Sequence, residues 1–99
     1  MKFGYMIQLQ IPKPWTETTE SEAHLNAVEQ AVQAEEAGFD RIWITEQHFY
    51  VEIGHSAAPD MMLAAMSQRT KRIRLGFGVV VSLVIIRFMS PNVSRPLIF

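Results

Sequence analysis

The sequence predicts an α/β fold built around a parallel β-sheet. Its hydrophobic pattern changes from a period of two residues to a period of about 3.6 and back again along the chain. Only a short connection separates each predicted helix from the strand that follows it. A β-α-β-α-β order with such connections predicts right-handed crossovers between parallel strands, as in a doubly wound sheet or a barrel.

The first strand is expected over residues 2–9, where apolar and small or polar side chains alternate. One face carries Phe3, Tyr5, Ile7 and Leu9. A polar loop with two prolines follows from residue 10 to about residue 20. Because most βα connections are shorter, a loop of this length is more often functional than accidental.

The first helix is expected to begin at about Ser21, a residue type that caps helices well, and to stop at Gly38. Its apolar positions follow helical spacing. They are Leu25, Val28 and Val32.

The second strand is expected over residues 41–45, and it runs directly into Glu46, Gln47, His48 and Phe49. Its central residues are all apolar, which suits a strand that is covered on both faces. A second helix should open at Pro59 and Asp60, since proline fits the first helical position and an acidic residue favours the helix N-terminus. The third strand is expected over residues 73–81.

Composition excludes several classes of protein. Apolar residues make up 48% of the chain, charged residues 19%, and the formal net charge is -1, so no strong field attracts nucleic acid or an anionic membrane. With no cysteine there is no disulfide, no thiolate nucleophile and no Cys-ligated zinc. The N-terminal residues alternate in polarity where a signal peptide needs a continuous apolar stretch. We therefore expect a cytoplasmic protein.

Candidate functional residues follow from the fold, because α/β proteins bind ligands beyond the carboxyl ends of their strands. Glu46 and His48 can be a hydrogen-bonded structural pair or a catalytic or cofactor-contacting pair. A metal site formed by these two residues with His55 is a weaker alternative. The other strand-end candidates are Gln8, Gln10, Gln47, Gly76, Phe77, Gly78 and Val79.

Three segments carry a resemblance to a known family. They read KFGYMIQLQ, GFDRIWITEQHF and AAPDMMLAAMSQRTKRIRLGFGVVV. Together, over residues 1–81, they resemble the N-terminal part of the bacterial-luciferase-like, flavin-dependent monooxygenases. The resemblance implies the N-terminal β-α-β-α-β portion of a (β/α)8 TIM barrel, truncated here because a barrel takes about 250 residues.

The resemblance also implies an activity. Members of this family are oxidoreductases that bind reduced FMN, or in some branches a deazaflavin, at the barrel mouth and incorporate oxygen from O2 into a small organic substrate. A flavin reductase is a possible partner, and the complete protein is expected to be a homo-oligomer. The 99-residue chain by itself is expected to be inactive and prone to self-association.

Particular residues follow from the family pattern, in which the second strand ends in Glu, two His and Phe. Glu46 and His48 match this pattern and are the catalytic candidates. Gln47 departs from it, and since an amide cannot act as a general base we expect a cofactor contact there. A non-prolyl cis peptide beside the flavin would map onto Gly78 and Val79, which makes both cofactor-binding candidates.

Residues 82–99 depart from the family. They lack an amphipathic period, and Pro91 and Pro96 break any helix. The segment SLVIIRFMSPNVSRPLIF can be encoded so that the frame starting one nucleotide earlier reads LPCHHPFHVAERIATLDI, which resembles the family's continuation. We therefore expect residues 1–81 to be a partial luciferase-like barrel domain and residues 82–99 to be a frameshifted tail.

Overall fold

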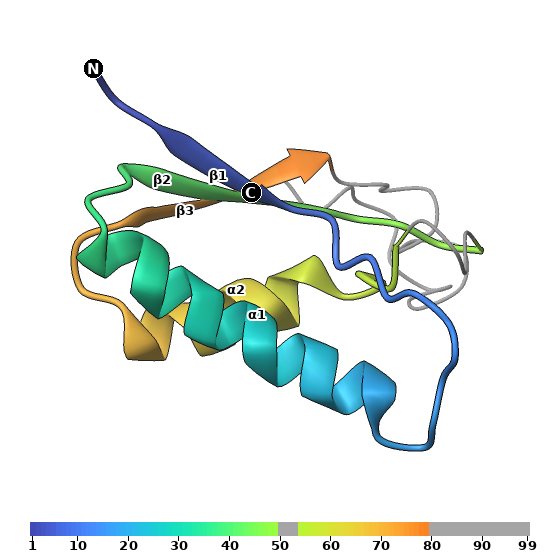
Figure 1. Ribbon diagram of the computed structural model, residues 1–99. Coiled ribbons are helices and arrows are strands. Elements are labelled where there is room, and N and C mark those ends of the chain that lie inside the picture. The colour runs from blue at the N-terminus through green and yellow to red at the C-terminus, as the bar shows by residue number, and fades with distance from the viewer. Residues whose placement is uncertain (50–53, 80–99) are drawn as a thin grey trace.

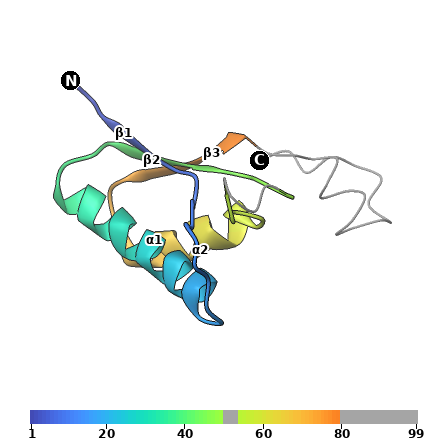
Figure 2. The same cartoon turned by 45° about the vertical axis from the view of Figure 1, so that its right-hand side comes forward.

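The computed structural model describes residues 1–49 and 54–79. Three strands form one parallel sheet in the order β1-β2-β3, and both helices pack on the same face of it (Figures 1 and 2). The predicted β-α-β-α-β order and the parallel sheet are confirmed. The elements are β1 (Gly4–Ile7), α1 (Thr19–Glu36), β2 (Arg41–Thr45), α2 (Pro59–Arg69) and β3 (Arg74–Val79).

The strand order is that of consecutive units in a barrel and also that of the first half of a doubly wound sheet, before its switch point. In a doubly wound sheet, helices cover both faces and the strand order reverses at a switch point. Here the strands follow one another in sequence order, and α1 and α2 lie side by side beneath one face (Figure 2). The described part therefore consists of consecutive βα units that wind in one direction.

The core forms between the sheet and the two helices. Ile42 and Ile44 of β2 are fully buried there, and Met66 of α2 is packed with them. The predicted apolar stripe of α1 is partly wrong, because Leu25 is 68% exposed. Small side chains let α1 approach the sheet closely, so the buried face of the helix consists of alanines. They are Ala27, Ala31 and Ala34.

Helix α1 begins before the predicted cap. Thr18 is the N-cap residue, and Ser21 lies inside the helix with its Oγ donating to the Thr18 carbonyl at 2.9 Å. The turn is closed earlier because Thr16 donates its backbone N–H to Thr19 Oγ1 at 2.9 Å. The predicted stop is confirmed, since the helix ends at Glu36 and Gly38 follows with φ +92°.

The strands differ from the predictions mainly in length. The bounds of β2 are those predicted, whereas β1 has only four residues and β3 begins at Arg74. The predicted extension of the third strand to residue 81 lies partly outside the described residues. The prediction that both faces of β2 are covered is wrong for the described part, where both helices lie on one face (Figure 1).

The face turned away from the helices carries Trp43. The six-membered ring of its indole lies against Gly76 of β3, since a Cβ added there would come within 2.8 Å of Trp43 Cζ3. On the other side the indole reaches β1, where a Cβ on Gly4 would lie 3.4 Å from Trp43 Nε1. One aromatic side chain thus spans all three strands, and the glycines on both sides leave room for it.

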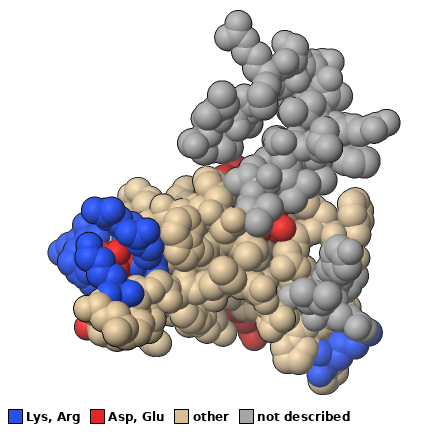
Figure 3. Space-filling model, turned by 90° about the horizontal axis from the view of Figure 1, so that it is seen from above, with Lys and Arg blue, Asp and Glu red and all other residues tan. Residues whose placement is uncertain are grey.

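At the edge of the sheet where β2 and β3 begin, hydrogen bonds hold neighbouring segments together. The Glu35 carboxylate accepts the backbone N–H groups of Lys71, Arg72 and Ile73 at 2.7–3.1 Å. These hydrogen bonds, that of Ile73 first, hold the pKa of Glu35 below its usual value. Figure 3 shows a large group of Lys and Arg side chains at one end of the molecule, with acidic atoms visible among them, and a smaller basic group at the other end. The hydrogen bond from Arg41 likewise lowers the pKa of Asp40.

Candidate active site

The candidate site lies where the chain leaves the carboxyl ends of β1 and β2. Two non-glycine residues near these ends have positive φ, Leu9 at 54° and Phe49 at 66°. Such backbone conformations are costly for residues with side chains, and they concentrate at active sites and ligand clamps. Both turns fall at the edge of the sheet where the predicted site residues collect.

Glu46 and His48 form a buried pair directly after β2. His48 Nε2 lies 2.6 Å from Glu46 Oε1, and 15% of the His48 side chain and 1% of the Glu46 side chain are exposed. Because a carboxylate can only accept a hydrogen bond, the imidazole donates its Nε2–H. The two side chains meet as the sequence predicts, and their catalytic role stays a prediction.

Gln47 lies between these two residues in the chain and packs against Gly54. A Cβ on Gly54 would lie 2.6 Å from Gln47 Oε1 and 2.9 Å from the Gln8 carbonyl oxygen, so only glycine fits at this position. The backbone N–H of Gln47 donates to the Ser56 carbonyl at 2.9 Å. The Gln47 carboxamide therefore lies beyond the carboxyl end of β2, where it can donate and accept hydrogen bonds but cannot take a proton.

Gly78 occupies an irregular position near the end of β3. Ile44 pairs with Phe77 and the next residue, Thr45, pairs with Val79, so Gly78 is the extra residue of a bulge. Bulges are over-represented next to active sites, where they redirect a strand. The side chain of Val79 lies outside the described part of the structure, and cis geometry at the Gly78–Val79 bond stays a prediction.

The end of β1 adds two further amides. Gln10 donates its Nε2–H to Gln8 Oε1 at 3.3 Å. Together with Gln47 they supply uncharged donors and acceptors beyond the carboxyl ends of β1 and β2. Such a set suits an uncharged polar heterocycle, and the exposed glycine backbone at Gly78 leaves space for a flat ring. The residues present therefore fit a flavin or deazaflavin ring.

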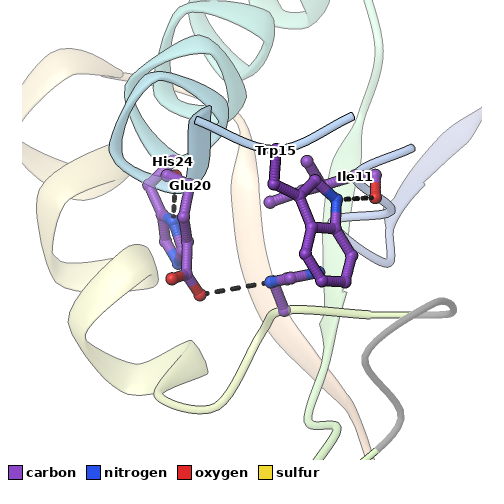
Figure 4. Close-up of polar contacts among 5 residues, drawn as sticks. Ile11, Trp15, Glu20 and His24 are labelled. Carbon is purple, nitrogen blue, oxygen red and sulfur yellow. Dashed lines mark hydrogen bonds and ion pairs between the residues drawn. The ribbon is translucent and has the colours of Figure 1, made fainter. Parts of the chain in front are cut away.

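His55 does not join the Glu46–His48 pair. Its Nδ1 contacts Glu20 Oε1 at 3.2 Å instead, and its ring meets Trp15 edge to face with the ring centroids 5.4 Å apart (Figure 4). Among residues 1–49 and 54–79, no three histidine, aspartate or glutamate side chains are placed to hold a metal ion. In the described residues, His55 is therefore not placed beside Glu46 and His48 as the alternative metal site requires.

Trp15 and Glu20 are residues that sequence reasoning missed. Both belong to the long loop after β1 or the turn that follows it, and the length of that loop was the only signal of a role. Their contacts could not be predicted, since Glu20 and His55 are 35 positions apart in the chain. With Ile11, Thr16, Thr19 and His55 they line a cavity of about 190 Å³.

Comparisons with known proteins point to one family. A family model for luciferase-like monooxygenases matches residues 1–85. The uncharacterized protein YwcH of Bacillus subtilis (strain 168) is 34% identical over 76 residues, which are 74% of this chain and 22% of that protein. Limonene 1,2-monooxygenase of Rhodococcus erythropolis is 52% identical over 44 residues, 43% of this chain and 11% of that enzyme.

A third relative has a different activity. The F420-dependent glucose-6-phosphate dehydrogenase of Amycolatopsis mediterranei (strain U-32) is 40% identical over 55 residues, which are 52% of this chain and 16% of that enzyme. The matched stretches thus cover between 11% and 22% of the length of these three relatives.

A parallel sheet with polar side chains beyond the carboxyl ends of its strands is the arrangement in which α/β proteins bind ligands. The chain belongs to the luciferase-like monooxygenase family, because the family model matches most of it. The resemblance read from its three segments is confirmed.

Within residues 1–49 and 54–79, neither helix combines the length and the apolar character that crossing a bilayer requires.

Proposed function

We propose that the chain is the N-terminal portion of a (β/α)8 barrel that belongs to a flavin-dependent monooxygenase. The consecutive strand order, with both helices on one face, is that of neighbouring units in a barrel, and the match to the luciferase-like family supports a barrel. So does a groove of about 590 Å³ between the outer edge of β1 and helix α1, where a closed barrel places a further strand and helix. The barrel segment is residues 1–81.

The cofactor would be held by Gln47, Gly78 and Val79. Gln47 offers a donor and an acceptor to the polar edge of the ring, and the bulged backbone at Gly78 offers a surface without a side chain. When bound, reduced FMN supplies the electrons for the reaction with O2. A deazaflavin is the second candidate, since one relative is named as F420-dependent.

The Glu46–His48 pair carries the proposal, because it places a proton-transferring group at the mouth. Glu46 accepts the Nε2–H of His48 and thereby fixes the orientation of the ring. Within the described residues His48 Nδ1 has no hydrogen-bond partner, so Nδ1 is the atom that holds or moves a proton during the oxygenation of a small organic substrate. Burial keeps water away from Glu46 and strengthens the contact.

A second proposal concerns the activity of the 99-residue chain by itself. Since the relatives are several times longer, most of a barrel would lie on strands that these 99 residues do not include. We propose that the chain alone is an inactive fragment, that residues 82–99 are read in a shifted frame, and that the complete protein is a homo-oligomer served by a flavin reductase. The shifted segment lies outside the described residues.

Two experiments separate these readings. Sequencing the DNA around the Val81 codon should reveal an insertion or deletion relative to close relatives, and a single intact frame would refute the shifted tail. The frame-restored protein should consume O2 with reduced FMN in the presence of a substrate, whereas the 99-residue chain should not. Activity of the short chain would exclude the inactive-fragment reading, and inactivity of both with FMN and deazaflavin would exclude the monooxygenase.

A further inference from the structure

Residues 54–56 connect the candidate site to a second cluster of side chains. Gly54 packs against the Gln47 carboxamide, and the Ser56 carbonyl accepts the backbone N–H of Gln47 at 2.9 Å. Between them, His55 donates its backbone N–H to the Leu9 carbonyl at 3.0 Å. One short segment thus touches Gln47 twice and the end of β1 once.

The side chain of His55 points toward Trp15, in the connection between β1 and α1, and toward Glu20, in the first turn of α1. It contacts Glu20 Oε1 through Nδ1 at 3.2 Å and meets the Trp15 ring edge to face at 5.4 Å (Figure 4). Only 12% of the His55 side chain is exposed. Trp15 is anchored in turn, since its Nε1–H donates to the Ile11 carbonyl at 3.0 Å.

The segment has little to hold it from within. Ser56 is fully buried, yet its Oγ has no hydrogen-bond partner in the described part of the chain. The contacts that place residues 54–56 include backbone hydrogen bonds with Gln47, Leu9 and Ala57 and those of the His55 side chain. Since Gly54 already leaves no room for a Cβ, a small displacement of the segment moves the Gln47 carboxamide or releases it.

We propose that Trp15, Glu20 and His55 form a positioning cluster that fixes Gln47 at the mouth. His55 touches no reacting group and acts through the backbone of residues 54–56, so it is a positioning residue. The role of Gln47 as a cofactor contact is taken from the proposed function, on which this proposal rests. The connection from His55 through residues 54–56 to Gln47 can be measured without any cofactor.

Amide hydrogen exchange of the ¹⁵N-labelled 99-residue chain tests the link. The reporter is the Gln47 N–H, which is bonded to Ser56, and the internal reference is the Ile73 N–H, which Glu35 binds at 2.8 Å at the opposite edge of the sheet. His55→Ala should make Gln47 exchange faster by about fivefold or more, the effect of weakening one hydrogen bond, and should leave Ile73 unchanged.

Two further variants complete the design. Trp15→Leu should accelerate Gln47 in the same selective way, because it removes the ring that His55 packs against. The matched control is His24→Ala. In the described residues the His24 Nδ1 contacts the Glu20 backbone carbonyl on α1, so this variant should change the exchange of neither amide.

Three results would overturn the proposal. In the first, Gln47 exchange is unchanged in His55→Ala. In the second, Gln47 and Ile73 accelerate equally, which indicates a general loss of stability. In the third, Gln47 exchanges at the random-coil rate in the unaltered chain, so that its bond to Ser56 is absent. A failure of FMN to bind would count against the proposed function and would leave the exchange result intact.

Discussion

Glu46 holds His48 through the Nε2 atom, with 2.6 Å between Nε2 and Oε1 and with the carboxylate almost completely buried. This contact fixes the tautomer, because neutral imidazole that donates from Nε2 keeps its lone pair on Nδ1. The pair at His55 uses the opposite nitrogen, since Nδ1 faces Glu20. Two imidazole–carboxylate pairs near one edge of the sheet thus favour different tautomers.

The first prediction concerns this tautomer. At a pH where His48 is neutral, ¹⁵N NMR should show mainly the Nε2–H form. Glu46→Gln should raise the Nδ1–H fraction by about tenfold, because hydrogen bonds to charged groups contribute about 1.5–3 kcal/mol. His24 is the reference, because its Nδ1 contacts the backbone carbonyl of Glu20 and not a carboxylate. An unchanged tautomer ratio at His48 would mean that Glu46 does not orient the ring.

The second prediction concerns Gly54. Gly54→Ala places a Cβ within 2.9 Å of the Gln8 backbone oxygen, which cannot move away as the Gln47 side chain can. Overpacking of this kind costs about 1–3 kcal/mol of unfolding free energy. Chemical denaturation should register this loss, and the Gln47 side-chain amide signals should shift. Gly38→Ala is the comparison, since nothing lies within 4 Å of its Cβ position and its cost comes from φ alone.

The third prediction concerns acid stability. Glu35 has a pKa below the usual value of about 4.3, so the unfolded chain takes up its proton first as the pH falls. Its contribution is complete above about pH 4.3 and is lost as the pH falls through the lower, folded-state pKa.

Glu35→Gln should lower the denaturation midpoint at pH 7 and flatten the decline of stability below about pH 4.3. The control is Glu36→Gln, because Glu36 is exposed one position further along the same helix. Equal pH profiles for Glu35→Gln and the unaltered chain would show that the hydrogen bonds accepted by Glu35 do not cause the loss of stability in acid.

The features predicted from the sequence are those that depend on local pattern. The bounds of β2, the proline start of α2 and the stop at Gly38 follow from residue preferences near each position. The buried face of α1 was harder, because alanines at close contact carry a weaker apolar signal than Leu25. Contacts between distant segments, such as Trp43 over Gly76 and His55 beside Glu20, leave no periodic trace in the sequence.

The fourth prediction concerns self-association. Within the described residues, both outer edges of the three-stranded sheet offer unpaired backbone groups, and in the sequence an apolar run starts at Val79, the last residue of β3. A chain that ends at Gly78 should stay monomeric in light scattering at concentrations where the 99-residue chain associates. Residues 80–99 lie outside the described structure, and equal association of both chains would place the contact elsewhere.

The most direct test of the proposed site is a flavin titration of the frame-restored protein with His48→Ala, Gln47→His and His24→Ala. The unaltered protein should quench FMN fluorescence saturably. His48→Ala should weaken the affinity or the turnover by about tenfold or more, as loss of a positioned contact does. Gln47→His and His24→Ala should be tolerated. Equal affinity and turnover for His48→Ala and His24→Ala would contradict a functional site at the end of β2.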